Sequence, residues 1–234
     1  MKHFMIVTNR WKDPALETTE KIRRFLTEAG CRVTVYAQEL EGEAWEGILK
    51  QEKADGMLVL GGDGTLLRAA RDSVESKIPV LGINMGTLGY LTEVEPGSLL
   101  ESLEQLVKGN YGLEERMLLT GKVLRGESML MDARALNDIT ITRTGHLQML
   151  YFQIFVNGKL LKEYHAAGGP IVEPNASVIL LTPICAHTLQ TRSVILRAED
   201  RIVIRIRERE DRETQPMEVS FDGDKNVALC PGDE

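Results

Sequence analysis

The sequence predicts two domains of different class: a Rossmann-like α/β domain at residues 1–112 and a β-rich, β-sandwich-like domain at residues 113–234. In the first part, short apolar runs alternate with amphipathic segments, which is typical of a mostly parallel sheet with helices on both faces. In the second part, strand-like runs follow one another with little helical periodicity between them. The predicted fold class is therefore α/β plus all-β.

Each element of the first domain is marked by an apolar pattern, and some by a glycine at the end. Gly30 and Gly109 follow two of the predicted helices, where glycine adopts the left-handed conformation at no steric cost. Strands are expected at residues 4–8, 32–36, 57–60 and 80–84. Helices are expected at residues 15–29, 44–51, 66–71 and 96–107.

The second domain is expected to consist of strands joined by turns. Asn157-Gly158 lies between two β-rich runs and is the strongest hairpin signal in the chain, because both residues tolerate positive φ angles. The strands are expected at residues 117–125, 139–143, 150–156, 159–164, 178–181, 194–197, 201–207 and 219–221.

Composition and charge exclude several classes of function. The formal net charge is −7 and the pI is about 5.3, whereas nucleic-acid binders usually carry a basic face. No apolar run is long enough for a membrane span or a signal sequence. Cys31, Cys185 and Cys230 are not at metal-ligand spacing and are expected to be reduced thiols, and the histidines do not cluster. We therefore expect a cytoplasmic protein with no nucleic-acid or membrane partner and no side-chain metal cluster.

The most informative stretch is Gly61-Gly62-Asp63-Gly64-Thr65, which lies between a predicted strand and a predicted helix. Glycines at such a turn let a bulky ligand approach the backbone, and the unpaired N–H groups of a helix N-terminus favour phosphate. A carboxylate facing phosphate is unfavourable unless it binds a cation or takes part in proton transfer. We interpret Asp63 as acting on Mg²⁺ or on a hydroxyl; the alternative is that it merely caps the helix.

Two further clusters support a nucleotide site. Residues 84–92 (NMGTLGYLT) directly follow another predicted strand, so the two glycine-bearing turns are expected to form opposite walls of one crevice. There, Asn84 could donate to a phosphate or ribose oxygen and Tyr90 could stack on a base, although a half-buried aromatic is the simpler alternative. In the second domain, Asn137-Asp138 could hold two ribose hydroxyls, or could form a turn before a strand.

The order of these motifs resembles that in bacterial NAD kinases, and the similarity covers nearly the whole chain. The segments concerned are residues 61–65, 84–92, 136–139, 167–171, 182–189 and 221–224. The first motif is shared with diacylglycerol and sphingosine kinases and with phosphofructokinases. The second and third together are much more specific to NAD kinases.

The resemblance implies transfer of a phosphoryl group from ATP, or from polyphosphate, to the 2′-hydroxyl of the adenosine ribose of NAD, giving NADP. It implies that Asp63 is the candidate base or metal-orienting carboxylate. It also implies that Gly62, Gly64 and Thr65 line the phosphate path. Phosphoryl transfer requires positioning and charge neutralisation, and Mg²⁺ or another divalent metal would supply the charge.

The same resemblance assigns the rest of the nucleotide site. Leu88 and Tyr90 would flank adenine, while Asn137 and Asp138 would hold the ribose and neighbouring groups of NAD. His187 lies in a family-like stretch and would approach the phosphates or the substrate, although a structural histidine is an equal alternative. The family also implies assembly into a homodimer or homotetramer through the β-rich domain.

The chain departs from the family between Ala166 and Ala167, where members have an additional segment that forms part of the NAD site. With this segment lost, the chain could be a catalytically impaired nucleotide-binding member of the family. Because other kinases share the glycine loop, a kinase that acts on a lipid or a sugar phosphate is a second alternative.

Overall fold

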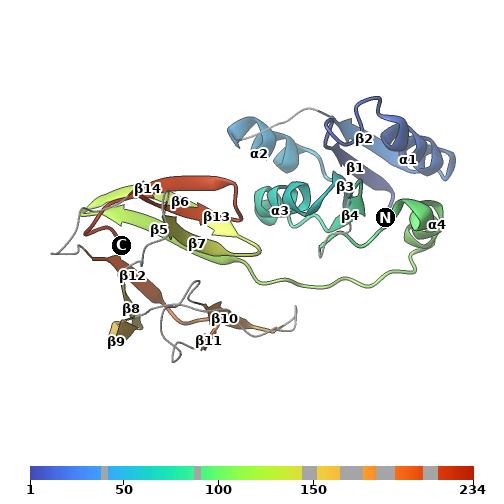
Figure 1. The fold of residues 1–234 in the computed structure, drawn as a ribbon. Coiled ribbons are helices and arrows are strands. Elements are labelled where there is room, and N and C mark those ends of the chain that lie inside the picture. Colours follow the sequence, from blue (N-terminus) through green and yellow to red (C-terminus); the bar gives the residue numbers. More distant parts are fainter. Residues whose placement is uncertain (38–41, 87–90, 144–151, 164–175, 183–192, 208–215) are drawn as a thin grey trace. The chain divides into compact units, whose positions relative to one another are not determined.

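The structure is a computed structural model that describes residues 1–37, 42–86, 91–143, 152–163, 176–182, 193–207 and 216–234. The chain forms two compact units, Met1–Glu114 and Glu115–Glu234. We call them the α/β unit and the β-rich unit. The predicted fold class, an α/β part followed by a β-rich part, is confirmed (Figure 1).

The α/β unit is built on a parallel sheet with strand order β2-β1-β3-β4. Its strands are β1 (His3–Thr8), β2 (Arg32–Tyr36), β3 (Gly56–Gly61) and β4 (Val80–Asn84). Its helices are α1 (Glu17–Glu28), α2 (Gly42–Gln51), α3 (Asp63–Asp72) and α4 (Leu99–Lys108), with short 3₁₀ turns η1 (Val74–Ser76) and η2 (Pro96–Ser98). The predicted strand–helix alternation is thus observed.

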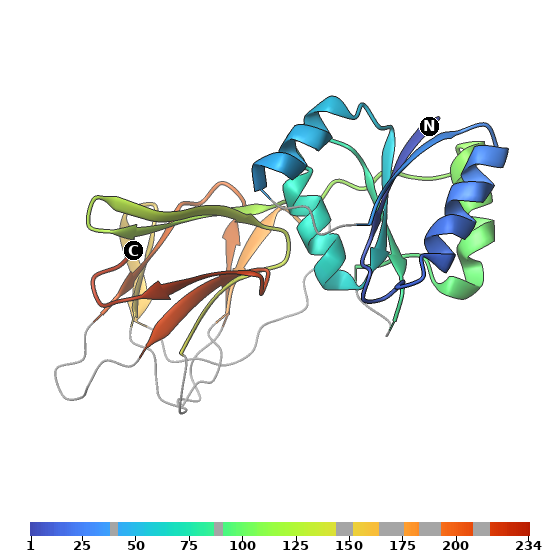
Figure 2. The same ribbon diagram turned by 90° about the horizontal axis from the view of Figure 1, so that it is seen from above.

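Alternation along the strands creates one core on each face of this sheet. Phe4 and Ile6 point to the face covered by α1 and α4, while Met5 between them points to the face covered by α2 and α3. Figure 2 shows these two helix pairs on opposite sides of the sheet. Every residue of β3 is buried, as expected for an inner strand of a parallel sheet. The glycine loop therefore begins from the best-packed strand of the unit.

The segment between β1 and α1 is fixed by a buried carboxylate. Asp13 is 5% exposed and accepts hydrogen bonds from the N–H of Thr19 at 2.9 Å and from its hydroxyl at 2.7 Å. Helix α1 begins at Glu17 rather than at residue 15, because Leu16 has a left-handed φ of 56°. The loop after β1 is therefore held firmly, and it forms part of the site described below.

The described residues of the β-rich unit form four small sheets. Their strands are β5 (Leu119–Arg125), β6 (Ser128–Ala135), β7 (Ile139–Arg143), β8 (Phe152–Val156), β9 (Lys159–Glu163), β10 (Val178–Leu181), β11 (Val194–Arg197), β12 (Ile202–Ile206), β13 (Met217–Phe221) and β14 (Lys225–Leu229). The sheets are β5-β6, β14-β13-β7, β12-β8-β9 and β10-β11. Strands β6 and β14 were not among the strands expected from the sequence.

The predicted Asn157-Gly158 hairpin is confirmed. These residues have φ angles of 50° and 79° and connect β8 to β9 in an antiparallel pair.

Elsewhere in the unit, glycine allows close packing: a Cβ at Gly121 in β5 would lie 2.6 Å from the Phe221 ring and 2.8 Å from Ile139. Phe221 is 1% exposed, so the end of β13 is locked against β5 and β7.

The last residues of the chain link two of these sheets. Backbone hydrogen bonds join Glu234 to Leu124 in β5 and Asp233 to Ile206 in β12. Asp233 is 1% exposed, and both its oxygens accept from the Arg125 guanidinium at 2.9 Å. Arg125 holds the pKa of this carboxyl below its usual range, with a further contribution from the N–H of Cys230.

We predict that Asp233→Asn lowers the free energy of unfolding by about 2 kcal/mol at pH 7, because the buried acceptor of a bidentate pair is lost. The lowered pKa means that this stabilisation is fully present above the ordinary carboxyl pKa of about 4 and is lost as the pH falls through the lowered value. Urea unfolding followed by circular dichroism at pH 7 and near pH 3 measures the difference. The control is Asp132→Asn, which removes an exposed pair with Lys122. An equal loss in the control, or a pH-independent difference, would contradict the prediction.

Candidate active site

The two glycine-bearing turns lie at the same edge of the parallel sheet. Gly61, the last residue of β3, is in register with Asn84, the last residue of β4. The N–H of Met85 donates to the carbonyl of Gly61 at 2.8 Å, so the pairing continues into the turns. Ligands of open α/β sheets bind beyond the carboxyl ends of the strands, and this is such an edge. The expected neighbouring position of the two turns is confirmed.

The three glycines of the first turn have different roles. A Cβ at Gly61 would lie 2.5 Å from Oγ1 of Thr65, so packing within the protein requires glycine there. Gly62 and Gly64 have no described atom within 4 Å of such a Cβ, and neither has a positive φ. Neither packing nor backbone conformation therefore requires glycine at these two positions, and the open space beside them suits a closely approaching ligand.

Asp63 is the first residue of helix α3, three residues before the predicted start. The preceding N-cap residue is Gly62, and no side chain makes a capping hydrogen bond. The Asp63 side chain is partly exposed, and its Oδ1 accepts from the N–H of Leu91 at 3.2 Å. This hydrogen bond connects the first turn to the end of the second cluster. The chemical role of Asp63 stays a prediction.

A third strand end contributes to this edge. Asn9 directly follows β1; its N–H donates to the carbonyl of Leu60 at 2.9 Å, and its Nδ2 donates to Oγ1 of Thr65 at 3.1 Å. Sequence reasoning missed Asn9, although it directly follows a predicted strand and Asn84 lies at the end of another. Thr65 is therefore oriented both by Asn9 and by its contact with Gly61.

A basic side chain from the same loop reaches this edge. Nζ of Lys12 lies 3.1 Å from the position that a Cβ would take at Gly86, in the second turn. Asp13, the next residue of the loop, is held in place by its hydrogen bonds with Thr19. Arg10 and Lys12 follow the first predicted strand, and this position could have indicated a basic group at the site. Neither residue was predicted as a site residue. The edge thus combines open glycine backbone, one carboxylate and one ammonium group.

Of the second cluster, the structure describes only the ends. Asn84 is 3% exposed, and its Oδ1 accepts from the N–H of Gly86 at 2.9 Å, so this oxygen shapes the turn. Donation from its amide to a ligand stays a prediction. Leu88, Tyr90 and His187 lie outside the described residues.

In the β-rich unit, Asn137 and Asp138 lie between β6 and β7, and both are exposed. Their side chains are adjacent: Nδ2 of Asn137 donates to Oδ2 of Asp138 at 3.4 Å. Partial burial of the carboxyl group, and then the negative charge of Asp222, raise the pKa of Asp138. Asp222 was not predicted as a site residue, although Asp222-Gly223 follows a predicted strand in the same way as the first glycine loop.

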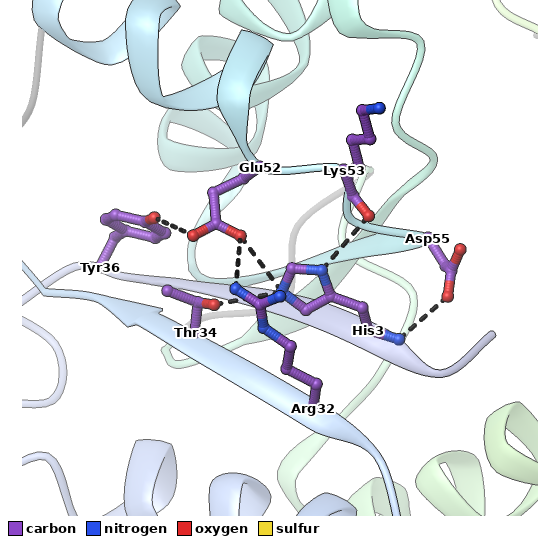
Figure 3. Close-up of polar contacts among 7 residues, drawn as sticks. All are labelled: His3, Arg32, Thr34, Tyr36, Glu52, Lys53 and Asp55. Carbon is purple, nitrogen blue, oxygen red and sulfur yellow. Dashed lines mark hydrogen bonds and ion pairs between the residues drawn. The ribbon is translucent and has the colours of Figure 1, made fainter.

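A separate polar pocket of about 290 Å³ lies beside β2 and the end of α2. Figure 3 shows the polar contacts of residues around it. Nε2 of His3 is 3.3 Å from Oε2 of Glu52 and 3.1 Å from the Thr34 hydroxyl, and Tyr36 donates to the other oxygen of Glu52. His3 begins β1, so it lies at the opposite edge of the parallel sheet from the glycine loop. These contacts tie β1, β2 and α2 together and are not part of the candidate active site.

The described residues contain no group of three or more histidine, cysteine or acidic side chains that could hold a metal ion. They also include no helix long and apolar enough to cross a membrane.

Comparison with known proteins identifies the family. The model of the ATP-NAD kinase N-terminal domain matches residues 4–111, and that of the C-terminal domain matches residues 164–234. NAD kinase of Lachnospira eligens is 37% identical, covering 100% of this chain and 90% of its own length. NAD kinase of Agathobacter rectalis is also 37% identical, covering 100% of this chain and 88% of its own length. The chain belongs to the NAD kinase family.

Solved structures agree on the fold. The crystal structure of yeast NADH kinase complexed with NADH matches with a TM-score of 0.82 at 22% identity, covering 100% of this chain and 76% of that one. An NAD kinase from Archaeoglobus fulgidus in complex with ATP matches with a TM-score of 0.72 at 21% identity, covering 99% and 88%. The resemblance noted in the sequence is thus confirmed.

The shorter length of this chain is visible in the same comparison. The alignment with the Lachnospira relative extends over 264 positions, 30 more than the 234 residues of this chain. The relative therefore has residues that this chain lacks. That the missing segment belongs after Ala166 stays a prediction, because residues 164–175 lie outside the described part of the structure.

We predict opposite effects for two alanine substitutions in the glycine loop. Gly64→Ala should keep or raise stability, by up to about 1 kcal/mol, because alanine favours a helix. It should nevertheless weaken nucleotide binding about tenfold or more, because the methyl group enters the open space. Gly61→Ala should cost about 2 kcal/mol of stability through its clash with Thr65. Thermal unfolding and calorimetric titration with ATP and NAD measure both effects. Unchanged nucleotide affinity of Gly64→Ala would show that ligands do not use this space.

Proposed function

We propose that this chain phosphorylates the 2′-hydroxyl of the adenosine ribose of NAD, using ATP or polyphosphate as donor and producing NADP. The observation that carries the proposal is the pair of glycines, Gly62 and Gly64, whose open space flanks the Asp63 carboxylate at the carboxyl edge of the sheet. Full-length relatives named NAD kinase support the choice of substrate.

Asp63 is the residue to which we assign the chemistry. The ribose 2′-oxygen forms a bond to the γ-phosphorus while the bond from that phosphorus to the donor oxygen breaks, and the hydroxyl proton passes to the carboxylate. Such a transfer depends on alignment and charge neutralisation rather than on a covalent intermediate. A carboxylate placed at the start of α3, next to open backbone, fits this role.

The phosphates are assigned to the sheet edge around Asp63. Gly62, Gly64 and Thr65 line the phosphate path, and Asn84 is proposed to donate to a phosphate or ribose oxygen. Lys12 adds the positive charge that the phosphates require, because its ammonium group lies against the second turn.

A divalent ion fits this site as a partner of the phosphates. Mg²⁺ usually takes one or two carboxylates together with substrate phosphate oxygens, and Asp63 offers such a carboxylate. When bound, the ion would neutralise charge on the transferred phosphoryl group.

The acceptor nucleotide is assigned mainly by family resemblance. Leu88 and Tyr90 are proposed to flank adenine, Asn137 and Asp138 to hold the ribose, and His187 to approach the phosphates or the substrate. The exposure of Asn137 and Asp138 supports their availability to a ligand.

We also propose self-association into a homodimer or homotetramer through the β-rich domain at residues 113–234, and a cytoplasmic location. Large exposed apolar side chains in this unit support an interface there. They are Met129, Leu130, Leu160 and Ile195. Sedimentation velocity measures the assembly directly.

We predict that Asp63→Asn lowers kcat by about 10²–10⁴-fold while nucleotide dissociation constants change only modestly, because the amide keeps the shape but accepts no proton. The measurement is NADP formation with ATP and with polyphosphate. The control is Glu101→Gln on α4, which removes the same charge from the opposite face of the sheet and should leave kcat unchanged.

The choice of acceptor is tested in the same assay. NAD is compared with a diacylglycerol and with a sugar phosphate, each supplied with ATP. Phosphorylation of either of these but not of NAD would reverse the assignment. Nucleotide binding with no NADP formed over a long incubation would instead support the catalytically impaired alternative.

A further inference from the structure

Asp222 has a backbone conformation that is uncommon for a residue with a side chain. It occupies the turn between β13 and β14 with a φ of 52°, followed by Gly223 with a φ of 70°. The N–H of Asp224 donates to the carbonyl of Phe221 at 3.1 Å and closes the turn. Asp-Gly is a sequence that favours such a hairpin turn, because Asp and Gly both tolerate positive φ angles. The turn directs the Asp222 side chain to contacts outside the hairpin.

Those contacts come from a segment that is distant in the sequence. Oδ2 of Asp222 accepts from the N–H of Leu136 at 2.9 Å, and Oδ1 accepts from the N–H of Asn137 at 2.8 Å and of Asp138 at 3.2 Å. The N–H of Asp222 donates in return to the carbonyl of Asp138 at 2.9 Å. One carboxylate thus fixes the backbone of three consecutive residues.

The residue that precedes Asp222 in the chain is firmly packed. Phe221 is almost fully buried, and its ring lies against Gly121 and Ile139, the first residue of β7. Asn137 and Asp138 immediately precede that strand. Asp222 therefore connects the firmly packed end of β13 to the exposed residues Asn137 and Asp138.

We propose that Asp222 is a positioning residue of the NAD site, which fixes the backbone of residues 136–138 so that the Asn137 and Asp138 side chains face the ribose. This inference rests on the proposed binding role of Asn137 and Asp138. In this scheme Asp222 acts through the backbone N–H groups that its two oxygens accept, and it is assigned no contact with the substrate.

The same arrangement has an electrostatic consequence. Partial burial and the negative charge of Asp222 raise the pKa of Asp138. The other charged residues nearest along the elements that meet there are Arg134, Asp224 and Lys225. If ionised Asp138 binds the ribose hydroxyls, partial burial and then the charge of Asp222 raise the pH at which NAD binding is lost in acid. Removing a purely structural contact without charge would not lower that pH.

The experiment compares Asp222→Asn with Asp138→Asn and with the control Glu218→Gln, which removes the same charge from β13. Asp222→Asn should raise the KM for NAD about tenfold or more, because an amide cannot accept all three N–H groups. The KM for ATP should stay within about twofold of wild type. The acid limb of the pH profile of kcat/KM for NAD should move to lower pH, because the pKa of Asp138 falls when the neighbouring charge is removed. Glu218→Gln should change none of these values.

A second variant separates charge from geometry. Asp222→Glu keeps the charge but lengthens the side chain. It should therefore raise the KM for NAD and leave the acid limb in place. If Asp222→Asn does not fold, Asp222→Glu provides the test of the KM for NAD. An unchanged KM and acid limb in Asp222→Asn, beside a raised KM in Asp138→Asn, would overturn the positioning role alone. An unchanged KM in Asp138→Asn would overturn the proposed binding role and this inference with it.

Discussion

The parallel pairing of β3 with β4 is the constraint on which the site in the α/β unit depends. It places Gly61 beside Asn84, so that both turns leave the sheet at one edge. Helix α3 begins directly after this strand end, with Asp63 as its first residue, and Thr65 packs closely against Gly61. A shift of register would separate the turns and move the carboxylate away from the second cluster. The position of the proposed chemical group is therefore a consequence of strand packing.

Local patterns were sufficient to predict most of the fold. Apolar runs and helix-ending glycines identified the parallel strands, and the Asn157-Gly158 turn identified its hairpin. The start of α3 was predicted three residues too late, because Gly64 has a low helix propensity that hides the first turn. Strand β6 was missed because its sequence contains no β-branched or aromatic residue, the types that mark strands most clearly. In each case tertiary packing decided what local propensity left open.

The candidate site was predictable where chemistry and spacing coincide, as at Asp63 with its glycines. It was not predictable where the contact joins distant parts of the chain. Asn9 reaches Thr65 across 56 residues, and Asp222 reaches Leu136 across 86. Lys12 can be recognised as a site residue only when it is known that β1 and β4 end at the same edge of the sheet. Such residues support the motifs without belonging to them, and a position just after a strand does not by itself assign them a role.

A crystal structure with NAD and a non-hydrolysable ATP analogue tests the central claim most directly. The measured quantity is the distance between the ribose 2′-oxygen of NAD and the Asp63 carboxylate. The account predicts a hydrogen-bonding distance of about 3 Å, with the donor phosphates beside Gly62 and Gly64. A 2′-oxygen bound far from Asp63, or protein side chains filling the space beside those glycines, would contradict it.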